Sequence, residues 1–153
     1  MNRRAAIAMT AAEAAAFLEE SRTVTCATIG RDGRPHLMPL WYVVRDGELW
    51  AWTYAKSQKV RNLERDARCT LQVETGVGYG ELRGVMLACD AVIHRDLDPV
   101  ARLGAEIAAR YGGGEITTEA AVALRAQAAK RVGLQFVEVR RASWDHRKLG
   151  GTY

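Results

Sequence analysis

The sequence predicts a mainly β protein, an antiparallel sheet or barrel with helices at its periphery. β-branched and aromatic runs follow one another along the first half of the chain. Two tight Asp-Gly turns join three of these runs, as hairpin turns do. Helical periodicity is confined to a few segments, whereas a parallel βαβ fold would alternate strands and helices throughout. We therefore expect neighbouring strands to pair as antiparallel hairpins.

The first elements can be read in order. Thr10 and Glu13 form a capping-box pattern, which predicts a helix over 10–21 that buries Phe17 and Leu18. Three strands are then expected, over 23–29, 35–44 and 49–54. A short helix opens at Ser57, and two further strands follow over 69–75 and 79–95.

Periodicity then becomes helical. Asp98 as a cap and Pro99 at the first helical position predict a helix over 98–111. The run of glycines at 112–114 breaks it, and an Ala-rich segment over 117–131 predicts a second helix. The strand over 132–140 closes the fold. We expect one domain, residues 1–153, with an N-terminal helix and a helical insertion near 97–131.

Composition restricts the class of protein. The 153 residues carry a formal charge of +4 with 26% charged residues, as in ordinary soluble globular proteins. No apolar run approaches the roughly 20 residues of a membrane helix, so we expect no membrane contact. Cys26, Cys69 and Cys89 lie in apolar runs without metal or disulfide spacing, which predicts buried, reduced thiols and a cytoplasmic location.

The helix that begins at Ser57 has cations near its N-terminus, where they are unusual. Helix N-termini favour acidic residues, because the backbone dipole is positive there. The cations at this start are Lys56, Lys59 and Arg61. Val60 and Leu63 supply an inward face, so we expect that Lys59 and Arg61 are not needed for packing. A bound phosphate would explain the arrangement; the alternative is a solvated helix whose cations happen to come early.

The neighbouring strands are rich in aromatic residues. One tight turn separates the strands that hold Trp41 and Trp52, so we expect them to pair side by side. Trp41, Trp52 and Tyr54 would then line a flat apolar slot that ends at the phosphate-binding helix. Such a slot suits a flavin-like ring with a phosphorylated tail. Taken alone, the aromatics are better explained as residues of the core or of a dimer interface.

Two long segments, over 23–44 and 49–74, carry a family resemblance. With the K-S-x-K-x-R-N-L motif at 56–63 and the tail SWDHRKLGGTY at 143–153, the chain resembles the split β-barrel flavoproteins that include pyridoxamine 5′-phosphate oxidase. It is most similar to their deazaflavin branch, the flavin/deazaflavin oxidoreductases. The resemblance implies a split β-barrel homodimer whose C-terminal tail helps to close a pocket at the dimer interface.

The resemblance also implies the site and its chemistry. It suggests a reductase that passes a hydride from reduced deazaflavin, coenzyme F420, to an unsaturated small-molecule substrate. The phosphate end of the cofactor would be held by Lys56, Ser57, Lys59, Arg61 and Asn62. The ring and substrate side would be bordered by Met38, Pro39, Leu40, Trp41, Trp52 and Thr53.

Two alternatives remain open. FMN could replace the deazaflavin, giving an FMN-dependent oxidase or reductase, although the longer anionic tail of the deazaflavin suits a wide cationic groove to which Arg147 and Lys148 could contribute. A non-catalytic flavin- or haem-binding protein is the other alternative. The arginine-histidine motif with which pyridoxamine phosphate oxidases hold their substrate is absent, so that reaction is not expected.

No residue is recognisable as a catalytic acid. His146 and Tyr54 are the side chains to consider as proton donors, beside solvent. The three histidines lack metal-ligand spacing, so no metal is expected. The cations are scattered among 18 acids instead of forming a basic stripe, so nucleic-acid binding is not expected either.

Overall fold

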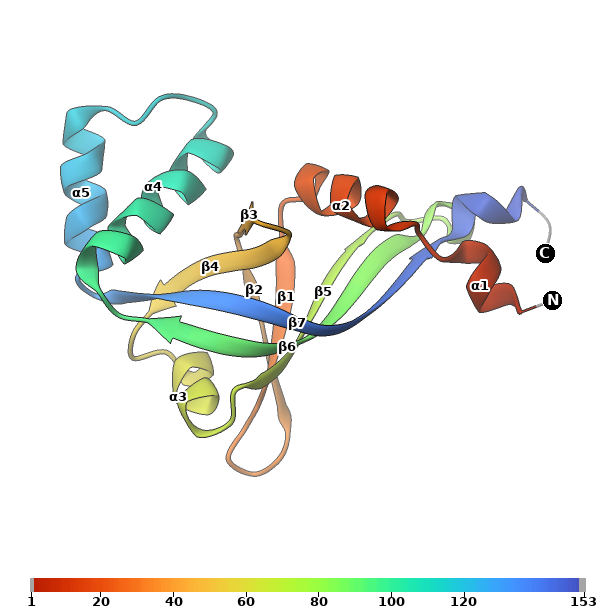
Figure 1. The fold of residues 1–153 in the computed structure, drawn as a ribbon, viewed down its shortest axis with the longest axis horizontal. Coiled ribbons are helices and arrows are strands. Elements are labelled where there is room, and N and C mark those ends of the chain that lie inside the picture. Colours follow the sequence, from red (N-terminus) through yellow and green to blue (C-terminus); the bar gives the residue numbers. More distant parts are fainter. Residues whose placement is uncertain (1, 152–153) are drawn as a thin grey trace.

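A computed structural model of the chain describes residues 2–151. In this range seven strands are accompanied by five α-helices and two short 3-10 helices (Figure 1). The strands are β1 (Val24–Ile29), β2 (Pro35–Leu40), β3 (Val43–Arg45), β4 (Glu48–Tyr54), β5 (Arg68–Thr75), β6 (Arg83–His94) and β7 (Arg131–Asp145). The α-helices are α1 (Arg3–Ile7), α2 (Ala11–Glu20), α3 (Gln58–Arg65), α4 (Leu97–Gly112) and α5 (Thr118–Ala128). The 3-10 helices are η1 (Tyr79–Glu81) and η2 (His146–Leu149).

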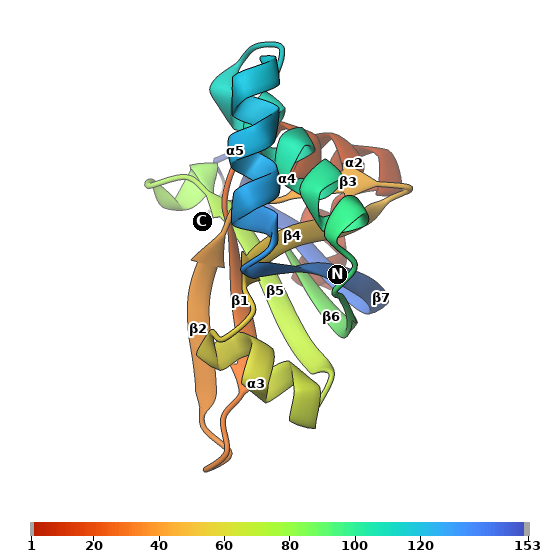
Figure 2. The same ribbon diagram turned by 90° about the vertical axis from the view of Figure 1, so that its left-hand side faces the viewer.

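The strands form one antiparallel sheet in the order β2-β1-β5-β6-β7-β4-β3. The first and last strands of this order, β2 and β3, follow each other in the chain, so the sheet must curl back on itself between them. Figure 2 shows β2 at one edge of the sheet, and Figure 1 shows α3 and the α4–α5 pair near one end of the molecule with α1 and η2 near the other. The prediction of a mainly β fold with peripheral helices is confirmed.

Local sequence signals are found where they were expected. Asp46 and Gly47 both adopt positive φ angles, 50° and 80°, as a two-residue hairpin turn between β3 and β4 requires. In α2, the Thr10 hydroxyl accepts from the Glu13 amide and the Glu13 carboxylate accepts from the Thr10 amide. These two features confirm the predicted hairpin and the predicted capping box.

The prediction of one continuous aromatic strand over 35–44 is wrong, because the strand breaks at Trp41 and Tyr42 into β2 and β3. Tyr42 turns inward and is fully buried, and its hydroxyl donates to the Leu18 carbonyl at 2.6 Å. Only β3 therefore pairs with β4, while β2 pairs with β1 along its whole length. The expected pairing of the two aromatic strands holds for the short β3 segment alone.

The helical insertion differs from its prediction at its start. α4 begins at Leu97 with Asp96 as the N-cap residue, so the predicted cap at Asp98 is wrong. Asp98 instead pairs with Arg125 of α5 at 2.5 Å and links the two helices. α5 follows Thr117, whose hydroxyl accepts from the Ala120 amide, and ends before the predicted boundary.

The chain ends contain elements that the sequence did not indicate. The closing strand β7 is longer than predicted, and α1 was not predicted at all. The tail motif over 143–153 contributes the end of β7 and η2, and its last two residues lie outside the described range. No helix among residues 2–151 combines the length and the apolar character needed to cross a bilayer.

The core fills the space enclosed by the sheet. Alternate residues of β1, β4, β5 and β6 point inward, together with the buried face of α2. Cys26, Cys69 and Cys89 belong to this core, and all three are buried and unbridged, as predicted. Burial raises the pKa of the Cys89 thiol to about 12, so this thiol stays protonated at neutral pH.

Candidate functional site

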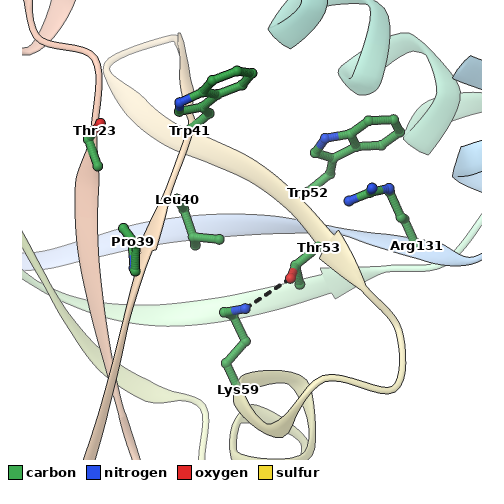
Figure 3. A pocket seen from close by; sticks show the side chains of 8 residues that line it. All are labelled: Thr23, Pro39, Leu40, Trp41, Trp52, Thr53, Lys59 and Arg131. Atoms are coloured by element: carbon green, nitrogen blue, oxygen red, sulfur yellow. Dashed lines mark hydrogen bonds between the residues drawn. The ribbon is translucent and has the colours of Figure 1, made fainter.

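A cavity of about 590 Å³ lies between the end of β2, β4 and α3 (Figure 3). This volume is in the range of small-molecule and cofactor pockets. The lining residues are Thr23, Pro39, Leu40, Trp41, Trp52, Thr53, Lys59 and Arg131. Two tryptophans and two cations are thus present, without an acidic side chain among the lining residues.

Lys59 is the cation that α3 contributes. Its side chain is only 7% exposed, and its Nζ donates to the Thr53 Oγ1 at 3.0 Å (Figure 3). The expectation that Lys59 takes no part in packing is therefore wrong. Lys59 shares a helix face with Asn62 and Leu63, three and four residues later, and that face packs toward the sheet. Burial lowers the pKa of the Lys59 ammonium, because the charged form loses hydration.

Arg131 is the second cation and was not identified from the sequence. Its guanidinium carbon lies 4.5 Å from the ring centre of Trp52 and 4.2 Å from that of Tyr54, so two aromatic rings hold it. Its Nε is buried without a hydrogen-bond partner. Because Tyr54 and Arg131 are register partners in the β4–β7 pair, the sheet brings together residues 77 positions apart; nothing in the local sequence indicates this.

Helix α4 positions both tryptophans. Trp41 stacks on Tyr111 of α4, with ring centres 4.5 Å apart and planes 10° apart. Trp52 packs against Gly104 of the same helix so closely that an added Cβ would lie 2.4 Å from its ring. The helical insertion is therefore the scaffold of the aromatic wall.

The start of α3 offers donors for an anion. Ser57 is the N-cap residue, as predicted, but its side chain makes no capping hydrogen bond. Its Oγ is buried without a partner. The first turn contains no acidic residue, and the first amides of a helix have no intrahelical acceptors. An anionic oxygen is the group that these donors and the helix dipole would favour.

The structure brings together only part of the predicted site. Pro39, Leu40, Trp41, Thr53 and Lys59 line the cavity. Met38 on β2 is 43% exposed and is not among the lining residues, and Lys56 is exposed just before α3. Their roles stay predictions.

Two other predicted residues lie on different sides of α3. Arg61 faces a separate depression of about 680 Å³, which Arg31 and Arg65 also line. Asn62 is fully buried, and its amide donates to the Thr28 Oγ1 at 3.0 Å. That contact ties α3 to β1, so Asn62 has a structural role whether or not a ligand binds.

The candidate proton donors lie far apart. Tyr54 is 58% exposed and covers Arg131. His146 directly follows β7 at the end opposite Arg131, and its Nδ1 lies 2.9 Å from the Tyr79 carbonyl oxygen. The two cations that follow it form ion pairs: Arg147 pairs with Asp145 and Lys148 pairs with Glu13, each at 2.6 Å. Within one chain, the described part of the tail, residues 143–151, is thus not among the lining residues of the cavity.

Among residues 2–151, no three side chains of His, Cys, Asp or Glu gather as the ligands of a metal ion would. The donors that do converge, a hydroxyl, two cations and helix amides, are groups that bind anions.

Solved structures show the same fold. The conserved hypothetical protein Rv2991 from Mycobacterium tuberculosis is 46% identical over 98% of this chain and 93% of its own, with a TM-score of 0.90. A FAD-binding protein from Mesorhizobium loti is 17% identical over 89% and 94% of the two chains, with a TM-score of 0.68. An F420 reductase is 20% identical over 83% and 94%, with a TM-score of 0.62.

A family model identifies the family to which the chain belongs. No curated protein matches the sequence significantly. The model for pyridoxamine 5′-phosphate oxidase, in contrast, matches residues 10–147, which include all seven strands and the whole cavity lining. The chain therefore belongs to the pyridoxamine 5′-phosphate oxidase family, with its split-barrel fold and flavin-related oxidoreductases.

Proposed function

We propose that this protein binds the deazaflavin coenzyme F420 and acts as a reductase of an unsaturated organic compound. The observation that carries this proposal is the cavity itself: two tryptophans and two cations, with no acid among the lining residues, beside a helix start whose donors are unsatisfied. A flat ring with an anionic tail is the ligand class that matches both features.

Each part of the site has a place in this proposal. The phosphate end would be held at the start of α3 by the Ser57 hydroxyl and the first amides, with Lys56 and Arg61 on the exposed side. The ring would lie against Trp41, Trp52 and the Pro39–Leu40 segment. Lys59 and Thr53, already hydrogen-bonded to each other, would offer polar contacts at the ring edge.

The choice of deazaflavin over FMN is supported by the charge beyond the cavity. The depression that Arg61 lines also has Arg31 and Arg65 among its lining residues, with Glu64 as its one acid. Because α3 lines both the cavity and this depression, a cofactor anchored at its start could extend a long anionic tail along these arginines. The shorter tail of FMN would leave them unused.

The chain's residues would position the two reactants and shield them from water, while the bound cofactor would supply the chemistry. When bound in its reduced form, the cofactor supplies a hydride to one carbon of the substrate double bond, and solvent supplies a proton to the other. Trp41 and Trp52 would exclude water from the ring face and orient the two molecules. The ammonium of Lys59 would donate a hydrogen bond to the negative charge that develops during transfer.

The proposal extends to assembly and location. We propose a homodimer, in which the tail of one protomer, distant from its own cavity, would reach the cavity of its partner. The three buried, unbridged thiols favour a reducing compartment, and we propose the cytoplasm.

A fluorescence titration of the purified protein with oxidised deazaflavin, run in parallel with FMN, tests this function. Tight deazaflavin binding and weak FMN binding are expected. Preference for FMN would move the chemistry to a flavin oxidase or reductase, and binding of neither would overturn the proposal. Turnover then separates an enzyme from a binding protein, since only an enzyme oxidises the reduced cofactor when substrate is added.

Charge reversal tests the phosphate site. Lys56→Glu with Arg61→Glu changes two exposed positions and should weaken deazaflavin binding without loss of the fold. Lys59 is unsuitable for this test, because a buried glutamate there would also disturb folding. Unchanged affinity in the folded double variant would refute the assignment.

A further inference from the structure

The guanidinium of Arg131 has no counter-ion. Among residues 2–151 no acidic oxygen lies within 4 Å of it, and its side chain makes no hydrogen bond there. Many other arginines of the chain do have partners; Arg110, for example, donates to the carbonyls of Glu19 and Ser21. A partly buried arginine left without an acceptor is costly unless a ligand provides one.

The same guanidinium is held in a fixed place. Trp52 and Tyr54 lie over it at 4.5 and 4.2 Å, which restricts its rotation while its N–H edge stays available. Figure 3 shows it pointing toward the middle of the lining residues. A planar fork of donors with restricted motion matches the two oxygens of a carboxylate, and little entropy is lost when the pair forms.

We propose that Arg131 is the anion-recognition residue of this cavity and that the molecule reduced there is a flat, unsaturated carboxylate. The carboxylate would pair with the guanidinium edge, and the conjugated part would lie against Trp52. That this ligand is a substrate rests on the proposed reductase function. That a carboxylate binds at Arg131 does not, and can be tested without any cofactor.

Calorimetric titration of the cofactor-free protein with trans-cinnamate, its neutral amide and phenyl phosphate tests the ligand class. Cinnamate should bind, and cinnamamide should bind about 10- to 100-fold more weakly, as the loss of a charge-assisted pair implies. Equal affinity for the amide would overturn the proposal. Tighter binding of phenyl phosphate than of cinnamate would overturn the choice of a carboxylate.

Variants test the residue. Arg131→Met should reduce cinnamate affinity as much as the amide substitution does, and Arg131→Lys should recover only part of it, because lysine lacks the planar fork. Arg140→Met removes an exposed cation from the same strand and should change nothing. Circular dichroism melting confirms that each variant is folded. A folded Arg131→Met protein that binds cinnamate like the wild type would refute the assignment.

Deazaflavin titration of the same variants separates this inference from the proposed function. Arg131→Met should lower deazaflavin affinity far less than cinnamate affinity, since the anionic end of the cofactor is assigned to the start of α3. An equal loss for deazaflavin and cinnamate would assign Arg131 to the cofactor and overturn its role toward the substrate. If the wild type binds cinnamate but no deazaflavin, the reductase proposal fails and the carboxylate site stands.

Discussion

Gly104 is the residue on which the position of Trp52 depends. A Cβ at this point of α4 would lie 2.4 Å from the Trp52 ring, so Gly104→Ala must push the ring toward the cavity. We expect a loss of about 1–3 kcal/mol in the free energy of unfolding, as overpacked cores show, together with weaker deazaflavin binding. Urea unfolding and fluorescence titration measure the two effects.

Gly112 provides the matched control in the same helix. An added Cβ there meets nothing within 4 Å, so Gly112→Ala should leave binding unchanged and raise stability by at most about 1 kcal/mol. If the two variants behave alike, the close contact between Gly104 and Trp52 is not what positions the ring.

Lys59 should make stability depend on alkaline pH. Burial lowers its pKa below the ordinary value of 10.5, so between the two values the unfolded chain binds more protons than the folded one. Stability therefore rises with pH across that window. Relative to Lys59→Met, the wild type should gain free energy of unfolding as pH increases from 7 toward 10.5. Other titrating groups are present in both proteins and largely cancel, except Cys26, whose thiol interacts with Lys59 and titrates differently once that charge is removed. A pH-independent difference in urea unfolding would contradict the assigned burial effect.

At the scale of elements, one side chain joins α4 to α2. Arg110, in the last turn of α4, donates to the carbonyls of Leu18, Glu19 and Ser21. These carbonyls lie at the C-terminus of α2, where the last carbonyls of a helix have no intrahelical donors. Arg110→Met should lower the free energy of unfolding by about 2–3 kcal/mol, because several charged hydrogen bonds are lost at a partly buried position. Arg102→Met, on the exposed face of the same helix, should cost less than about 0.5 kcal/mol. Chemical denaturation compares them, and equal losses would argue against the cap.

Elements whose cause is local could be predicted, and those set by distant contacts could not. The capping box of Thr10 and the hairpin turn at Asp46 depend on a few adjacent residues. The break after β2 depends on Tyr42 reaching the carbonyl of Leu18, across the core. Arg131 joins the site only through its register with Tyr54. Sequence reasoning therefore named Trp41, Trp52 and Lys59 of the cavity lining, but not the second cation there.

At the scale of the whole molecule, β2 is an unusual edge. It pairs with β1 on one side only and begins the strand order, yet Leu37 and Met38 on it are 56% and 43% exposed. Exposed apolar edges invite pairing with another chain, and Pro35 and Pro39 limit this edge to side-chain contacts by removing two backbone donors. This is where we expect the partner protomer to dock.

Sedimentation equilibrium tests the dimer. The wild type should have twice the 16.9 kDa mass of one chain. Leu37→Lys should shift it toward the monomer with an unchanged far-UV spectrum, because a lysine placed in an apolar contact must be desolvated. Val122→Lys, an equally drastic change at an exposed valine of α5, should leave the dimer intact. If the wild type is monomeric at tens of micromolar, the tail cannot reach the cavity of a partner protomer. The His146 imidazole, at the far end of β7 from Arg131, would then have no access to the substrate.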